Sequence, residues 1–296
     1  MVAYLDMFPV LFSLGNLSVS SFGVFLALGF LLGIFLIWRL ARAWDLDEEK
    51  VLDLTLLTLI GGLIGARIYF VLENFQFFSQ HLFGILVIYK YPGFSFWGGI
   101  IGGVLTLYFL VRKKKDNFLQ ALDIASVGVV GALVLSDLGC FLGGCGVGAP
   151  NNLFFSVNMV GVLGKRFPVQ VLEALLFLFA LSRLWSSATH FHQRGKILSL
   201  SLIYFGAVKL LTSPLRAQNE FLLFFVFLFC GVYIFYKVTK RKLISDLKNL
   251  PKEVTMERLK KYWYNQKTAL VWNLRNLKKI LRRFNVRLSW KKSRQY

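Results

Sequence analysis

The sequence is a succession of apolar runs, each about 20 residues long, separated by short charged segments. About 20 apolar residues are what an α-helix needs to cross the hydrocarbon core of a bilayer. The chain is only 17% charged, whereas a soluble domain carries about 25% charged residues. We therefore expect an all-α integral membrane protein. Seven runs are expected to span the membrane, at about 19–41, 51–72, 94–111, 119–142, 168–187, 197–212 and 219–236.

The charges between these runs predict the orientation of the chain. Lys and Arg accumulate in loops that face the cytoplasm, and basic clusters follow the first, third, fifth and seventh runs. An odd number of spans then places the N-terminus outside and the C-terminus in the cytoplasm. The four clusters are Arg39 with Arg42, Arg112–Lys115, Arg194 with Lys196, and Lys237–Lys242.

The N-terminal segment, residues 1–17, is short and apolar and contains Pro9 and Gly15. We expect it to lie in the membrane interface as a re-entrant or amphipathic piece. No cleavable signal peptide is expected, because a basic n-region and a small-residue cleavage site are not evident.

The C-terminal tail, residues 238–296, is strongly basic. Residues from Lys237 onward hold 19 Lys and Arg against 3 Asp and Glu, which accounts for 16 of the 20 net positive charges. We expect a basic amphipathic helix on the anionic cytoplasmic membrane surface, with a partner helix or, less favoured, nucleic acid as alternatives. Residues 1–237 would form the membrane domain. The predicted apolar stripe, at three- and four-residue steps, is Leu270, Leu274, Leu277, Leu281, Phe284 and Leu288.

Two features suggest a site near the outer face. Arg67 lies inside the second run, and a cation within a span is costly and indicates function. Glu73 is about 120° away around an ideal helix, so the two are not expected to pair directly. We expect Arg67 to bind an anion such as a lipid phosphate, with a structural arginine as the alternative. The second feature is the Gly98-Gly99 pair within YPGFSFWGGIIGG, which either packs against a helix or admits a substrate.

A second glycine-rich stretch, LSDLGCFLGGCGVG, begins at Leu135 and contains Asp137 and Gly139 near the outer end of the fourth run. Such backbone can direct N–H groups toward a phosphate. The chain's three cysteines do not suggest a disulfide framework. Because Cys140 and Cys145 lack nearby histidines, we expect packing roles and no metal site.

Further polar residues belong to the fifth and sixth runs and the segment that follows. Gln170 and Glu173 are three apart and share a helix face, where they either join helices or hold substrate. Lys209 and Arg216 lie toward the same side of the membrane as Arg67 and fit an anion-binding cavity. Interfacial snorkelling is the alternative for Lys209.

Taken in chain order, these segments resemble the prolipoprotein diacylglyceryl transferase family over about residues 20–220. The specific pieces are GARIYFVLEN and GFSFWGGIIGG, supported by LGCFLGGCGVG, RFPVQVLEALL and RGKILSLSLIYFG. The resemblance implies seven membrane helices with an outer head region in a bacterial plasma membrane, and no cofactor. It also implies transfer of diacylglyceryl from phosphatidylglycerol to the lipobox cysteine of a preprolipoprotein, with release of glycerol 1-phosphate.

The resemblance further implies the partners and the substrate-binding residues. The partners are phosphatidylglycerol and preprolipoprotein signal peptides. The departing phosphate must be held by cations, and Arg suits it because its guanidinium binds in a bidentate manner. The implied substrate-binding residues are Arg67, Gly98, Gly99, Gly139, Gln170, Glu173 and Arg216, and Lys209 is added for its charge and position.

Several residues depart from the family pattern, among them Phe22 for a Tyr, Gly143 for an Asn, and Phe205, Lys209 and Ser213 in the last motif. Two further departures bear on the chemistry. Trp97 stands where the family has His, and indole has no acceptor nitrogen. Asp137 stands where the family signature has an arginine, which exchanges attraction to a phosphate for repulsion. No catalytic residue is assigned. Two functions therefore stay open, a transferase with a rearranged site and a non-catalytic protein that binds phospholipid or lipoprotein precursors. A solute transporter is disfavoured, because no inverted repeat is evident.

Overall fold

The computed structural model describes residues 9–14, 17–85, 87, 91, 93–113, 117–151, 153, 156–159, 161–190, 193–216 and 221–240. The chain divides into two compact units, Met1–Thr239 and Lys240–Tyr296. All described residues except Lys240 belong to the first unit. The amphipathic helix predicted in the basic tail lies outside the described residues.

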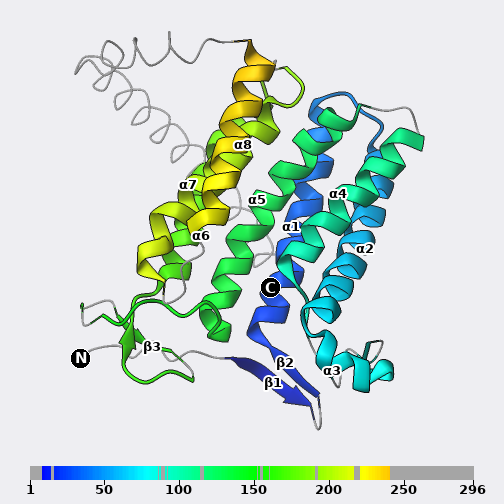
Figure 1. Cartoon of the computed structure of the whole chain (residues 1–296). Coiled ribbons are helices and arrows are strands. Elements are labelled where there is room, and N and C mark those ends of the chain that lie inside the picture. Colours follow the sequence, from blue (N-terminus) through cyan, green and yellow to red (C-terminus); the bar gives the residue numbers. More distant parts are fainter. Residues whose placement is uncertain are drawn as a thin grey trace, which may run out of the picture. The chain divides into compact units, whose positions relative to one another are not determined.

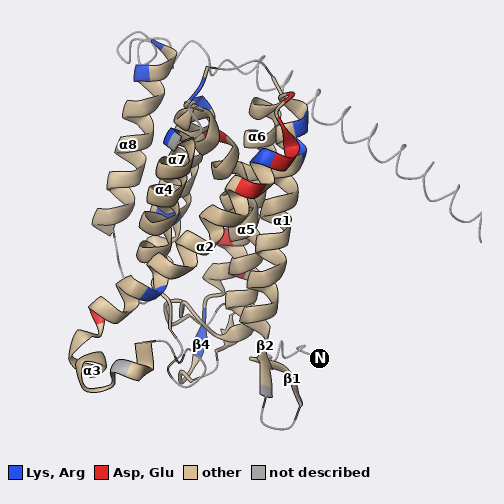
Figure 2. Cartoon of the chain, turned by 90° about the vertical axis from the view of Figure 1, so that its right-hand side faces the viewer, with Lys and Arg blue, Asp and Glu red and all other residues tan. Residues whose placement is uncertain are grey.

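The first unit is built from long helices that coincide with the apolar runs (Figure 1). Six helices in the described part of the chain are long and apolar enough to cross a membrane, and the apolar part of α4, Phe96–Arg112, is shorter. Figure 2 shows most charged residues toward the helix ends, as expected for a multi-pass membrane protein. The long helices are α1 (Ser21–Ala43), α2 (Glu48–Glu73), α4 (Phe96–Lys113), α5 (Phe118–Gly143), α6 (Val169–Ala188), α7 (Lys196–Thr212) and α8 (Phe221–Thr239).

The helix ends follow from the chemistry of a few residues. The side chains of Ser20 and Asp47 each accept a hydrogen bond from the backbone N–H three residues on, and so cap α1 and α2. Helix α5 ends at Gly144, whose φ of 77° is a left-handed conformation that favours glycine. These local signals explain why the helices begin and end close to the predicted positions.

The N-terminus of helix α7 is capped by a residue of another helix. Its N-cap is Gly195, which has no side chain to accept the first backbone N–H groups. The carboxylate of Asp123, fully buried on α5, accepts from the N–H of Gly195 at 2.6 Å and of Leu198 at 2.7 Å. Asp123 therefore fixes the start of α7 against α5, and the unsatisfied donors of a helix N-terminus find their partner on another helix.

Helices α2 and α4 pack closely through glycines. A Cβ atom on Gly98 would lie 2.5 Å from the carbonyl oxygen of Gly65, and one on Gly65 would lie 2.6 Å from that of Gly98. A Cβ on Gly99 would lie at an ordinary 3.6 Å from Ala66. Gly98 thus serves helix packing, because only glycine lets the two backbones approach so closely.

The other five long helices enclose the core. Helix α1 packs along α5, α5 contacts α6 and α7, and α7 packs along α8. Figure 1 shows α2 and α4 beside α1 and α5, with α6, α7 and α8 on the other side. Apolar side chains from α1, α5, α6 and α7 fill the interior. Among the fully buried ones are Leu40, Val127, Phe177, Leu184 and Ile197.

Short elements connect the helices. Strands β1 (Val10–Leu14) and β2 (Leu17–Ser20) form an antiparallel hairpin. The described part of residues 1–17 is therefore a pair of strands, and its place in the membrane interface stays a prediction. A Gly-Asn pair between two short apolar runs is a hairpin signal, and it was missed. The remaining short elements are α3 (Phe75–Gln80), η1 (Leu82–Ile85), β3 (Val157–Asn158) paired with β4 (Lys165–Arg166), and η2 (Ser213–Leu215).

Candidate functional site

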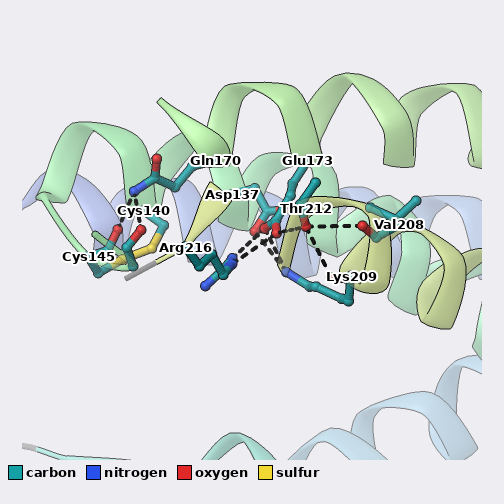
Figure 3. Close-up of polar contacts among 10 residues, drawn as sticks. Asp137, Cys140, Cys145, Gln170, Glu173, Val208, Lys209, Thr212 and Arg216 are labelled. Carbon is teal, nitrogen blue, oxygen red and sulfur yellow. Dashed lines mark hydrogen bonds and ion pairs between the residues drawn. A yellow bond between two sulfur atoms is a disulfide. The ribbon is translucent and has the colours of Figure 1, made fainter. Parts of the chain in front are cut away.

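Glu173 on α6 is the centre of a polar cluster within the helices (Figure 3). Its side chain is fully buried, and Oε2 accepts from Lys209 Nζ at 2.7 Å. Thr212 Oγ1 donates to Oε1 at 2.6 Å. Arg216 donates from Nε to Oε1 at 3.1 Å and from Nη2 to Oε2 at 2.5 Å. A buried carboxylate is tolerated only when it is paired and hydrogen-bonded in this way.

The helix period brings these partners to one place. Lys209 and Thr212 are three residues apart on α7, so they share the face that meets α6. Helix α7 then passes into the turn η2, and Arg216 follows in an extended conformation. That change of direction turns the guanidinium back toward Glu173. The predicted joining of α6 and α7 by Glu173 is therefore observed.

Asp137 on α5 adds a second carboxylate to the cluster. It is 8% exposed, and its Oδ1 atom lies 4.0 Å from Lys209 Nζ. Its Oδ2 atom is buried and has no hydrogen-bond partner among the described residues. Two carboxylates thus face two cations, Lys209 and Arg216. Within the part of the chain that the structure describes, no three His, Cys, Asp or Glu side chains gather as a metal site requires.

Cys140 and Cys145 form a disulfide, so the expectation that they are separate packing residues is wrong. Because α5 ends at the left-handed Gly144, the chain doubles back and brings the two Cα atoms within 4.9 Å. Gln170, fully buried at the start of α6, donates from Nε2 to the carbonyl oxygens of Cys145 at 2.5 Å and Gly146 at 2.8 Å. Gln170 therefore binds the backbone of the turn after α5 rather than a side chain on another helix.

The same turn reaches Arg216. A Cβ atom on Gly146 would lie 3.4 Å from Arg216 Nη1 and 3.6 Å from Cys140 Sγ. Gly148 forms an isolated antiparallel bridge with Arg216, and Ala149 N–H donates to the carbonyl of Leu215 at 2.8 Å. The glycine-rich stretch and the segment that carries Arg216 are therefore paired through their backbones.

Arg67 occupies a different place. The residue is 7% exposed, and its guanidinium is surrounded by carbonyl oxygens of the segment between α3 and α4. Its ring contacts are with Phe70 and Phe78. None of its described interactions reaches Glu173, Lys209 or Arg216. These contacts are those of a structural arginine, and its role toward a phosphate stays a prediction. The accepting carbonyls, at 2.8 to 3.0 Å, are those of Gly84, Ile85, Tyr91 and Gly93.

Gly139 and Trp97 are both packed against neighbouring helices. A Cβ atom on Gly139 would lie 2.5 Å from Phe25 Cβ of α1, so this glycine allows α1 and α5 to approach. The Trp97 ring stacks on Phe227 of α8, with centroids 5.7 Å apart. Trp97 thus contributes to an aromatic contact between α4 and α8. Of the predicted residues, Glu173, Lys209 and Arg216 meet in one cluster, and Gln170 binds the turn that lies beside Arg216. The described interactions leave Arg67, Gly98, Gly99 and Gly139 outside the cluster.

Comparisons with known proteins show the family to which the chain belongs. The sequence profile of the family described as prolipoprotein diacylglyceryl transferase matches residues 9–242, which include every described helix and the cluster. Similar proteins are named phosphatidylglycerol–prolipoprotein diacylglyceryl transferase. The one from Finegoldia magna is 27% identical over 250 residues, covering 81% of this chain and 99% of its own. The one from Streptococcus equi subsp. zooepidemicus is 30% identical over 223 residues, covering 73% and 86%. This chain belongs to the prolipoprotein diacylglyceryl transferase family.

Proposed function

We propose that this protein transfers the diacylglyceryl group of phosphatidylglycerol to the lipobox cysteine of preprolipoproteins in a bacterial plasma membrane. Membership of the family and the names of its relatives support this function. The observation that carries it is the convergence of Lys209 and Arg216 on Glu173, beside the glycine-rich turn after α5. Cations held within a membrane bundle can bind a lipid phosphate, and Glu173 fixes the position of both.

Arg216 has a free edge with which to hold a phosphate. Glu173 occupies the edge formed by Nε and Nη2, and Nη1 has no hydrogen bond among the described residues. The Arg216 side chain is 24% exposed, whereas that of Glu173 is fully buried. The guanidinium can therefore contact the pair and a ligand at once. Lys209 Nζ lies on the other side of Glu173 and adds a second positive charge.

The reaction has simple requirements. The thiolate sulfur attacks the glycerol carbon that bears the phosphate, a C–S bond forms, and the C–O bond breaks. The electron pair of that bond leaves with glycerol 1-phosphate, whose added negative charge Arg216 and Lys209 stabilise. The thiol proton must pass to a base. We assign this role to Asp137, because its Oδ2 atom is buried beside the cations without a described partner and Trp97 has no acceptor nitrogen.

We also propose that α4 is a seventh span, with the N-terminus outside and the C-terminus in the cytoplasm. Arg112 and Lys237 lie near the C-terminal ends of α4 and α8, as expected for cytoplasmic ends. The Cys140–Cys145 disulfide lies at the C-terminal end of α5. It supports an outer position for the site, because disulfides persist outside the cytoplasm. The basic tail, 238–296, would then meet the anionic cytoplasmic surface.

A second function, lipid binding without turnover, is favoured by two observations. Both cations of the cluster already face carboxylates, and the indole of Trp97 is stacked on Phe227 where the family resemblance places a histidine. This alternative predicts that phosphatidylglycerol binds in an Arg216-dependent manner while no thioether forms.

One experiment separates the two functions. The full-length protein is reconstituted in phosphatidylglycerol vesicles with a lipobox peptide, and mass spectrometry is used to detect a diacylglyceryl thioether. The transferase predicts the product, with a rate that Asp137→Asn lowers about a hundredfold while lipid binding persists. Lipid binding without product in the wild-type protein establishes the non-catalytic alternative.

A further inference from the structure

The turn after α5, which the disulfide closes, is rich in glycine, and the described residues form few hydrogen bonds within it. Gly144 and Gly146 have φ of 77° and 67°. Within the turn, Cys145 N–H donates to the carbonyl of Cys140 at 3.0 Å and Gly144 N–H donates to that of Phe141 at 3.4 Å. Glycine-rich backbone has many conformations open to it. A covalent link between Cys140 and Cys145 removes much of this freedom.

This turn lies against Arg216, which forms the proposed phosphate site together with Lys209. Gly146 lies between the disulfide and Arg216, since its Cβ position is 3.6 Å from Cys140 Sγ and 3.4 Å from Arg216 Nη1. Nη1 belongs to the edge of the guanidinium that Glu173 leaves open. Gln170 Nε2, on α6, donates hydrogen bonds to the carbonyl oxygens of Cys145 and Gly146 in the same turn. A change in the turn therefore acts directly on the edge that would receive the phosphate.

The chain that follows the turn also pairs with the segment that carries Arg216. Gly148 bridges Arg216, and Ala149 N–H donates to the carbonyl of Leu215. The segment that carries Arg216 is thus held on one side by Glu173 and on the other by the backbone that leaves the disulfide-closed turn. Of the two, only the disulfide-closed turn depends on a bond that a change in redox conditions breaks.

We propose that the Cys140–Cys145 disulfide is a redox-sensitive support of the phosphate site, so that reducing it weakens phosphatidylglycerol binding and reforming it restores binding. A dithiol reductant supplies two electrons and two protons, the S–S bond becomes two thiols, and the reductant becomes a disulfide. Cys140 and Cys145 are positioning residues that act through Gly146, Gln170 and Arg216. The kinetic consequence rests on the proposed transferase function.

The bond itself is tested first. The chain has three cysteines, and Cys230 is free and exposed, so a Cys230→Ser variant leaves only the pair. This variant is denatured, treated with an alkylating reagent and weighed by mass spectrometry, before and after dithiol treatment. We expect no label before reduction and two labels afterwards. Two labels before reduction contradict the proposal.

The functional consequence is measured on the same Cys230→Ser protein in phosphatidylglycerol vesicles, oxidised, reduced and reoxidised. We expect reduction to raise the KM for phosphatidylglycerol about tenfold, the effect of weakening one charge-assisted hydrogen bond, with a smaller change in kcat. Reoxidation restores the KM. A variant with Cys140→Ser and Cys145→Ser added behaves as the reduced protein with or without the dithiol. An unchanged KM in fully reduced protein overturns the proposal.

A readout without turnover separates this proposal from the proposed function. Amide hydrogen exchange of Cys145–Ala149 and equilibrium binding of phosphatidylglycerol in neutral-lipid vesicles are compared for oxidised and reduced protein. Faster exchange and weaker binding on reduction support the redox-sensitive site even when no thioether is made. Unchanged exchange and binding overturn it even when transfer is active. Reduction in place avoids dependence on the folding of the double variant.

Discussion

Arg216 and Glu173 form a bidentate ion pair between the segment after α7 and helix α6. Nε meets Oε1 at 3.1 Å and Nη2 meets Oε2 at 2.5 Å, yet the Glu173 side chain is fully buried and that of Arg216 is 24% exposed. This difference separates two roles. Glu173 holds the cations in place, and Arg216 presents its remaining edge to a ligand.

Removing the charge of Glu173 is expected to destabilise the fold as well as the site. Glu173→Gln removes the buried carboxylate that Lys209 and Arg216 share and leaves Asp137 as the remaining carboxylate of the cluster, so the free energy of unfolding falls by about 3–5 kcal/mol. Thermal unfolding in detergent measures the loss. The control is Glu48→Gln, whose ion pair with Arg42 is exposed and is worth about 1 kcal/mol or less. Equal effects of the two substitutions contradict the role given to Glu173.

The remote cap of α7 is expected to affect stability without affecting chemistry. Asp123→Ala leaves the N–H groups of Gly195 and Leu198 without their carboxylate, and should cost about 1–3 kcal/mol. Transfer per folded molecule should keep its kcat and KM. Chemical denaturation and a transfer assay, both normalised to folded protein, give the two quantities. A fall in kcat at unchanged stability is incompatible with a capping role.

The Gly98-Gly99 pair offers a matched comparison. Gly98→Ala places a methyl group 2.5 Å from the carbonyl oxygen of Gly65, whereas Gly99→Ala places one at 3.6 Å from Ala66. We expect Gly98→Ala to reduce stability by about 1–3 kcal/mol and Gly99→Ala to be near neutral. Unfolding midpoints of the two variants test this. A Gly99→Ala variant that loses lipid binding at normal stability supports instead the substrate role implied by the family resemblance.

Arg67 is expected to order the segment before α4. The side chain reaches four carbonyl oxygens at once, and an ammonium group has only three donors and lacks the planar fork. Arg67→Lys should therefore speed amide exchange over residues 84–93 nearly as much as Arg67→Ala. Hydrogen-exchange mass spectrometry measures this. Normal exchange in both variants, combined with a raised KM for phosphatidylglycerol, identifies Arg67 as a phosphate ligand.

Much of the helical fold could be predicted from the sequence, because span length and hydropathy are local properties. The run predicted at about 119–142 is helix α5, Phe118–Gly143, and the run at about 168–187 is α6, Val169–Ala188. The hairpin of β1 and β2 does not follow from hydropathy, because an apolar segment beside a membrane span gives no strand signal on that scale. Its local signal is the Gly-Asn pair between two short apolar runs.

The polar residues in the apolar runs could be picked out from the sequence, whereas their contacts could not. Gln170, Glu173, Lys209 and Arg216 were singled out because polar groups in apolar runs are costly. Their pairing depends on how α6 and α7 pack, and Glu173 and Arg216 are 43 residues apart. The disulfide could not be predicted, because the spacing of the two cysteines does not show that α5 ends between them. Arg67 was expected to need an anion, yet backbone carbonyls supply its partners.

The steady-state transfer kinetics of Arg216→Ala test the central claim most directly. In phosphatidylglycerol vesicles with a lipobox peptide, we expect kcat/KM to fall about a hundredfold or more, because a charge-stabilising donor to the leaving phosphate is lost. Arg216→Lys should restore little of it, since an ammonium cannot hold Glu173 and a phosphate through one planar group. The control is Arg42→Ala, an exposed arginine that pairs with Glu48, which should transfer at the wild-type rate. Wild-type turnover in Arg216→Ala contradicts the account.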